Sequence, residues 1–273
     1  MTADELGPSD AAILETFVVP RYLKLFGDVV LESILPADGA KLLHLGCRTG
    51  YPEVQVAERL RMANLVGLDR SASAIELART KAQLVHGTTR VDHIVGDPFS
   101  VPYEDQSFSH ALALCPSIPG HDARLRLFAE LARLVAPSGQ ILLGLPMRGS
   151  FQEVLDLFRE HALKNDAGEI AKATDIASLS RPNPESITEE LEAAGFDDVD
   201  VEIVRSSLSW KSGRDFFEDP VTRLMILPDL EAHFEGVDLT RALKYARDAI
   251  DRYWSESDFE LTVVIGCVSG RRY

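Results

Sequence analysis

The residues best suited to chemistry lie in a glycine-containing turn that follows an apolar run, His44-Leu45-Gly46-Cys47-Arg48-Thr49-Gly50. Glycine lets the chain turn sharply and lets a ligand approach the backbone closely. A helix that begins after such a turn favours an anionic group at its amino terminus. Asp69 follows about twenty residues later, at the end of a second apolar run, where a carboxylate can accept from ribose hydroxyls. The pattern predicts a nucleotide-binding turn.

Two common nucleotide motifs do not fit this turn. A dinucleotide-binding fingerprint requires glycine at 46, 48 and 51, but the sequence has Arg48 and Tyr51. A Walker loop ends in Gly-Lys-Ser/Thr, which is absent here. The turn therefore belongs to a different class of nucleotide site.

The elements that position these residues are short apolar runs with little polar alternation, as in parallel strands covered on both faces. We expect strands at 41–45, 64–69, 91–95, 111–115, 140–145, 199–204 and 259–268. Helical spacing separates several of them, with Ser71 and Ser73 as candidate caps before the stripe Ile75, Ala78, Ala82 and Val85. The alternation predicts an α/β class, doubly wound, mostly parallel seven-stranded sheet with helical insertions.

Four stretches describe the expected domain organisation. They are an N-terminal helical segment at 1–37, a core at 38–205, a helical insertion or lid at 206–258 and a final core strand at 259–273. The stripe in the third stretch, formed by Leu239, Leu243, Ala246, Ile250 and Tyr253, either packs against the sheet or covers a substrate pocket.

Smaller features complete the expected organisation. Residues 1–8 are expected to be unstructured, and residues 146–185 to form a helix around 151–158 followed by a polar connection. Ser186-Ile187-Thr188-Glu189 has capping-box spacing, and Gly195 is well placed to end the helix that follows.

The composition limits the classes of partner and the cellular location that we expect. Asp and Glu number 43 against 28 Lys and Arg, and the net charge of −15 disfavours nucleic acid as a partner. Cys47, Cys115 and Cys267 form no Cys-x-x-Cys pair and indicate no disulfide framework. No signal peptide or membrane-spanning run is visible, so we expect a cytoplasmic protein without membrane partners.

The turn resembles that of class I S-adenosylmethionine (SAM)-dependent methyltransferases, in particular a methyltransferase type 11-like domain, whose motif is close to Asp-x-Gly-Cys-Gly-Thr-Gly. Gly96-Asp97-Pro98-Phe99 is similar to the family's segment after the third strand. Leu131–Gly139 resembles its helix and turn before the fifth strand, and Ala194-Gly195-Phe196 its turn before the sixth. The resemblance covers residues 38–145 well and 186–204 loosely, and it implies a Rossmann-like fold with SAM as cofactor.

The resemblance also implies roles for single residues. Gly46, Cys47 and Gly50 pass beside the methionine part and ribose of SAM, Asp69 holds the ribose and Asp97 the adenine. Cys115 lies near the transferable methyl group. The implied cofactor-binding set is Gly46, Cys47, Arg48, Gly50, Asp69, Arg70, Asp97, Pro98 and Cys115. The structural alternatives are a plain turn for the glycines, a helix cap or a solvated acid for Asp69, a turn residue for Asp97 and core packing for Cys115.

The sequence departs from the family pattern at two important positions. His44 replaces an acidic partner of the SAM ammonium, and losing such a bond costs about 1.5–3 kcal/mol, or about 10- to 100-fold in affinity. Arg48 replaces a glycine, and its side chain either occupies the pocket or holds the cofactor's carboxylate. Two hypotheses follow: a working methyltransferase with a modified pocket, or a pseudo-methyltransferase that serves as a protein-binding or scaffold module.

The expected chemistry, if the chain is active, is in-line methyl transfer, which needs positioning more than a general base. His121 is the candidate base, with an exposed loop histidine as its alternative. Cys115-Pro116-Ser117-Ile118 lacks the carbonyl side chain of amino-group methylases, so DNA adenine and protein glutamine are disfavoured substrates. No carboxylate/His cluster has ligand spacing, so no metal is expected. The expected partner is a small-molecule substrate, with a protein as the alternative.

Overall fold

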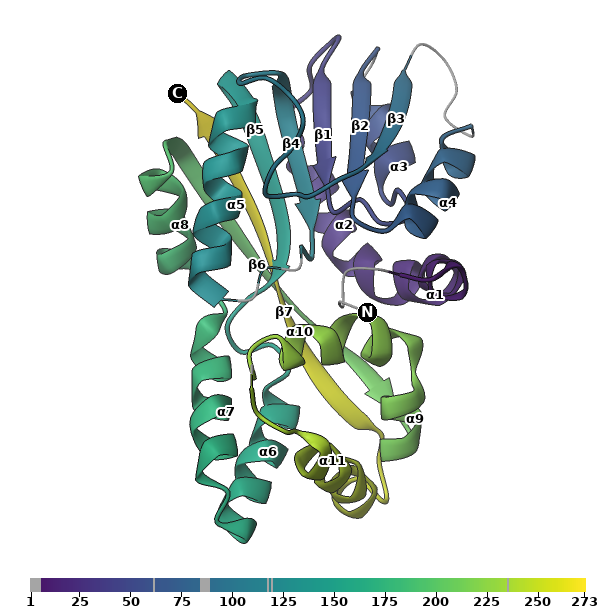
Figure 1. Ribbon diagram of the computed structural model, residues 1–273, viewed down its shortest axis with the longest axis vertical. Helices are drawn as coiled ribbons and strands as arrows, with labels where there is room; N and C mark the ends of the chain where they lie inside the picture. Colours follow the sequence, from purple (N-terminus) through teal and green to yellow (C-terminus); the bar gives the residue numbers. More distant parts are fainter. Residues whose placement is uncertain (1–5, 61, 84–88, 117, 119, 235) are drawn as a thin grey trace.

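The computed structural model describes residues 6–60, 62–83, 89–116, 118, 120–234 and 236–273, and within them seven strands form one sheet (Figure 1). Their order is β3-β2-β1-β4-β5-β7-β6. The strands are β1 (Lys41–Leu45), β2 (Asn64–Asp69), β3 (Arg90–Val95), β4 (Phe108–Leu114), β5 (Val135–Pro146), β6 (Phe196–Trp210) and β7 (Phe259–Arg272). β7 pairs antiparallel with β5 and with β6, and the other strand pairs are parallel. The predicted doubly wound, mostly parallel sheet is confirmed.

Three helices connect the first five strands: α3 (Glu53–Arg59), α4 (Ala72–Ala82) and α5 (Gly120–Leu134). Ser71 caps α4, because its hydroxyl accepts from the Ala74 N–H at 3.2 Å, as one of the two candidate caps predicted. Val85, the last residue of the predicted stripe, lies outside the described residues. So do Met1–Glu5 of the start of the chain.

Helical structure runs from Pro8 to Glu32 through α1 (Pro8–Ile13), η1 (Leu14–Leu23) and α2 (Lys24–Glu32). Only Leu6 and Gly7 of the described residues precede it, so the expectation of an unstructured start is wrong at Pro8, which begins a helix. Buried residues recur at every fourth position along one face, namely Leu14, Val18, Tyr22, Phe26 and Val30. This face packs into the same core cluster as Leu42 of β1, Leu112 of β4 and Leu142 of β5.

The segment between β5 and β6 holds more helix than predicted. It contains α6 (Gln152–Asn165), α7 (Gly168–Ser180) and α8 (Pro184–Ala193). The prediction of a polar connection after α6 is wrong, because Ile170, Thr174 and Ala177 of α7 are buried at helical spacing. The predicted cap at Ser186 is also wrong in position. Asn183 is the N-cap of α8 and Ser186 its third residue, since a proline after Asn183 starts the helix there.

β6 and β7 are longer than predicted and extend together beyond the rest of the sheet, into the group formed by the later helices (Figure 1). β6 continues to Trp210, which pairs with Phe259, so the first five residues of 206–258 are strand. The rest of that stretch holds α9 (Gly213–Glu218), η2 (Thr222–Ile226), α10 (Leu227–Glu231) and α11 (Thr240–Tyr253). The apolar stripe predicted at 239–253 coincides with α11, whose Ala246 and Ile250 are buried.

Candidate functional site

The turn after β1 lies where the chain order in the sheet reverses, because β2 and β3 extend from one side of β1 and β4 from the other. The carboxyl ends of strands at such a point form the usual ligand crevice of α/β sheets. Gly46, Arg48 and Gly50 have φ angles of 65°, 47° and 81°. Glycine adopts this left-handed conformation freely, whereas arginine costs about 1 kcal/mol there. The turn is therefore strained at Arg48 alone of these three.

Asp69, at the end of β2, holds this turn in place. Its carboxylate accepts from the Arg48 N–H at 2.9 Å and from the Ser71 N–H at 2.8 Å. The side chain is almost buried, and the residue lines a cavity at the crevice. Asp69 thus joins the β1 turn to the start of α4 and still faces open space with a carboxylate.

The segment after β3 lies at the same edge of the sheet. Asp97 accepts from the Phe99 N–H at 3.0 Å and from the Arg70 guanidinium at 2.8 Å. The Phe99 N–H, then Arg70, lowers the pKa of Asp97 below its ordinary value. The Arg126 guanidinium carbon lies 4.7 Å from the centre of the Phe99 ring. Asp97 is half-exposed, so these contacts form an acidic and aromatic edge beside the cavity.

The Arg48 side chain crosses from the β1 turn to the end of β4. Its guanidinium donates to the carbonyl oxygens of Leu114 at 2.9 Å and Cys115 at 2.6 Å, and to that of Gly46 at 3.4 Å. The resemblance puts the methionine part of SAM beside Gly46 and the transferable methyl group near Cys115, so the guanidinium bonds the carbonyls of both residues. The arginine therefore uses the acceptors that an ammonium group there would need.

The cavity itself has a volume of about 110 Å³ and is partly open to solvent, and this volume is below the roughly 300–1,000 Å³ of pockets that enclose a drug-sized ligand. Six of the nine predicted cofactor residues line it: Gly46, Arg48, Asp69, Arg70, Pro98 and Cys115. Cys47, Gly50 and Asp97 are not among its lining residues. Cys115 is buried, and burial raises the pKa of its thiol, which stays protonated.

The other side of the cavity comes from parts of the chain that were not predicted as site residues. Leu14 and Tyr22 come from η1, and Leu224, Met225 and Asp229 from the segment after β6. In the sequence Tyr22 stands out only because it is the one residue with a hydroxyl group in a helical stripe of apolar residues. Asp229 has no signal at all, because its position depends on the fold of 211–258.

Two polar groups stand out in this apolar half. Burial, then the neighbouring Cys115 and Asp229, raises the pKa of Tyr22 well above 10, so its phenol is neutral. The Asp229 carboxylate forms an ion pair with Arg181. This half of the cavity thus offers one neutral donor and one carboxylate against mostly apolar walls.

His121, the candidate base, lies at the start of α5. Its Nδ1 is 2.9 Å from Glu190 Oε1 of α8, its side chain is 58% exposed, and it is not among the cavity-lining residues. Glu190 also accepts two bonds from the buried Arg124, at 2.8 and 2.7 Å. In this arrangement His121 belongs to an ion cluster between two helices.

His44, the departure from the family pattern on β1, points into the protein. Its Nδ1 lies 3.0 Å from Glu53 Oε1, and His93 Nε2 of β3 lies 2.7 Å from Glu53 Oε2. Burial raises the pKa of Glu53, but the hydrogen bonds from the two histidines outweigh it and hold the pKa below its ordinary value. The buried Glu53 carboxylate of α3 therefore gives His44 a hydrogen-bond partner inside the protein.

Residues 42–139 match a family model described as a methyltransferase domain. An O-methyltransferase, cnsE, from Penicillium expansum is 25% identical over 63% of this chain and 58% of its own length. The ubiquinone/menaquinone biosynthesis C-methyltransferase UbiE of Dinoroseobacter shibae is 26% identical over 64% of this chain and 74% of its own. The chain spans less than two thirds of some relatives, 58% of cnsE and 60% of the methyltransferase GfsG of Streptomyces halstedii.

Solved structures share the fold. A methyltransferase from Bacillus halodurans aligns with a TM-score of 0.58 at 13% identity, covering 90% of this chain and 98% of its own. A Haemonchus contortus phosphoethanolamine N-methyltransferase 2, solved with SAM, aligns with a TM-score of 0.52 at 18% identity, covering 90% of this chain and 52% of its own. In the described part of the chain no helix is long and apolar enough to span a membrane.

Proposed function

Because residues 42–139 of this chain belong to the class I SAM-dependent methyltransferases, we propose that the protein methylates a small apolar molecule with SAM as donor. One observation carries the proposal. A single cavity is lined on one side by the predicted cofactor residues and on the other by apolar residues of η1 and 222–232. Donor and acceptor would therefore bind side by side in one crevice, which is partly open to solvent.

The residues present suit an adenosyl group at the strand ends. Asp69 faces the cavity with a carboxylate whose oxygens each accept one backbone bond, which leaves lone pairs for ribose hydroxyls. Pro98 and Phe99 offer an apolar surface for the adenine, with Asp97 at its edge. Bound SAM supplies an electrophilic methyl group on a good leaving group, so the protein's task is to position the acceptor and exclude water.

The apolar side suits the acceptor. We propose that 206–258 acts as a lid, because Leu224, Met225 and Asp229 line the cavity from that stretch. Tyr22 donates a hydrogen bond from its phenol to the acceptor oxygen and keeps its proton. An Asp229 carboxylate oxygen takes the proton that the acceptor oxygen loses as its bond to the methyl group forms. Relatives whose names state small-molecule methylation, such as the 27-O-demethylrifamycin SV methyltransferase of Amycolatopsis mediterranei, support this class of substrate.

A second candidate function rests on Arg48. Its guanidinium already bonds the carbonyls of Leu114 and Cys115, and it adds positive charge where a cationic cofactor would bind. These contacts favour a fold that binds a partner or another ligand and takes up SAM weakly or not at all.

Calorimetric titration separates the two candidates. A catalytic protein is expected to bind SAM and its demethylated product, and to transfer a labelled methyl group to members of an apolar hydroxylated library. Absence of heat and of protection against unfolding at millimolar SAM would end the enzymatic proposal and leave the binding module.

A further inference from the structure

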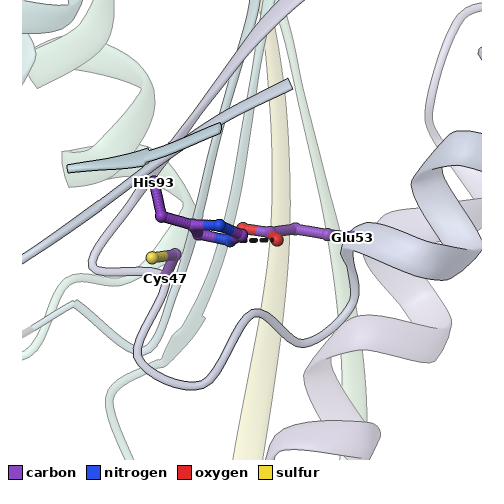
Figure 2. A group of neighbouring side chains, drawn as sticks. All are labelled: Cys47, Glu53 and His93. Atoms are coloured by element: carbon purple, nitrogen blue, oxygen red, sulfur yellow. Dashed lines mark hydrogen bonds and ion pairs between the residues drawn. The ribbon is translucent and has the colours of Figure 1, made fainter. Parts of the chain in front are cut away.

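A compact cluster of metal-ligating side chains lies beneath the cofactor turn, on the side away from the cavity lining. It is formed by Cys47 of the turn, Glu53 at the start of α3 and His93 of β3, with His44 of β1 beside them. Figure 2 shows His93 and Glu53 meeting from these separate segments, with Cys47 beside the His93 ring. Their exposed fractions are 2%, 3% and 5%, and that of His44 is 1%.

The ligand atoms of Cys47, Glu53 and His93 all lie within 4.8 Å of one another. Gly67 of β2 makes room for them. A Cβ atom at this glycine would lie 2.5 Å from His93 Cδ2, 2.7 Å from Glu53 Oε1 and 2.9 Å from Cys47 Sγ. Any other residue at 67 would therefore intrude on all three groups.

Hydrogen bonds within the cluster do not satisfy every buried polar atom. Glu53 accepts from both histidines, but His44 Nε2 and His93 Nδ1 have no hydrogen-bond partner in the described structure. Buried polar atoms without partners are uncommon and call for an explanation. Of the two His93 ring nitrogens, Nε2 bonds Glu53 and Nδ1 has no partner among the described residues. The imidazole proton can therefore move from one nitrogen to the other when a ligand binds.

We propose that Cys47, Glu53 and His93 bind a zinc ion. A thiolate, an imidazole nitrogen and a carboxylate oxygen are the three ligand types that zinc takes from proteins. Bound zinc would be held by one imidazole nitrogen of His93, with the imidazole proton on the other, and by the Cys47 thiolate, whose proton would be released to solvent. His44 keeps its Nδ1–H bond to the other Glu53 oxygen and orients the carboxylate. The fourth position of the metal is left to a small donor such as water.

The zinc would tie the cofactor turn to α3 and to β3, three segments that are distant in the sequence. Its role is independent of methyl transfer, since none of the three ligands lines the cavity. The site therefore belongs to the scaffold of the turn, and it can be tested without a substrate.

The test begins with the intact chain expressed with zinc, and separately with cobalt in place of zinc. We expect about one metal per chain by mass spectrometry after gel filtration in weak chelator. The cobalt protein is expected to show a thiolate-to-cobalt charge-transfer band and the strong visible bands of a four-coordinate ion. A wild-type protein with only traces of metal and no charge-transfer band would overturn the proposal.

Variants assign the ligands. Cys47→Ser is expected to abolish the charge-transfer band, and His93→Gln to lower metal content at least tenfold. His44→Gln, which removes only the support of Glu53, is expected to weaken binding about 10- to 100-fold. Cys267→Ser is the matched control, because Cys267 is equally buried but bonds Ser33 far from the cluster. A band that persists in folded Cys47→Ser, or disappears equally in Cys267→Ser, contradicts the assignment.

Discussion

Arg48→Gly tests how the cofactor end of the cavity works. In the structure the Arg48 guanidinium donates to the carbonyls of Leu114 at 2.9 Å and Cys115 at 2.6 Å. Removing the side chain frees both acceptors and withdraws one positive charge from a site meant for a cationic cofactor. We therefore expect the variant to bind SAM more tightly than the wild type.

The expected gain in SAM affinity follows from the carbonyl acceptors that the substitution makes available to the cofactor. One charge-assisted hydrogen bond from the SAM ammonium contributes about 1.5–3 kcal/mol, which corresponds to about 10- to 100-fold in affinity. Relief of the left-handed strain at Arg48, about 1 kcal/mol, acts on free and bound protein alike and cancels in binding. The relieved strain instead raises the free energy of unfolding of the variant, and the loss of the guanidinium hydrogen bonds lowers it.

Isothermal titration calorimetry with SAM measures the change, at two salt concentrations because the argument includes a like-charge repulsion. Arg214→Gln is the control for a lost positive charge, since Arg214 is exposed on α9 and forms a surface ion pair with Glu218 in the next turn. If Arg48→Gly binds SAM more weakly than the wild type, the guanidinium holds the cofactor's carboxylate, and our interpretation of its position is refuted.

Three further predictions concern the site and its support. Asp69→Asn is expected to weaken SAM binding about 10-fold or more by calorimetry, because the ribose loses a charged acceptor, and unchanged affinity would exclude that role. Arg124→Met is expected to lower the free energy of unfolding in urea by about 3–5 kcal/mol, because it leaves the Glu190 carboxylate buried without its guanidinium, and a loss under about 1 kcal/mol would contradict this. Burial raises the pKa of Glu190, but bonds from Arg124 and His121 outweigh it and hold the pKa below 4.5, so its ionised form stabilises the fold above pH 4.5. The unfolding free energy that Glu190→Gln removes at neutral pH should therefore shrink as pH falls through that lower pKa, whereas a constant difference between the two proteins would argue against the linkage.

The sequence predicted the strands and their parallel order well, because buried runs such as 41–45 and 64–69 carry a strong apolar signal. It also pointed to Asp69, whose position after a strand is local information. Local patterns said nothing of the cluster around Glu53, because Cys47, Glu53 and His93 meet only once β2 has paired with both β1 and β3. For the same reason no spacing indicated a metal.

The wrong or missing predictions in the second half of the chain also have physical causes. α7 carries few large apolar residues, so its helical period is faint until α6 packs against it. The cap of α8 moved to Asn183 because proline at the next position suits the first helical turn better than Ser186 suits the cap. Asp229 reaches the cavity only because 211–258 folds back over η1, which depends on contacts far apart in the chain.

The long hairpin of β6 and β7 has a consequence for how the molecule comes apart. Its register runs unbroken from Asp200 opposite Ser269 to Trp210 opposite Phe259, so the same two strands belong to the parallel sheet at one end and to the helical group at the other. At the far end of the hairpin the Phe216 ring packs edge to face with the rings of Trp210 and Phe259. Unfolding of either the sheet or the helical group would break β6–β7 hydrogen bonds on which the other part also depends. Heating should therefore give one transition whose calorimetric enthalpy equals its van't Hoff enthalpy.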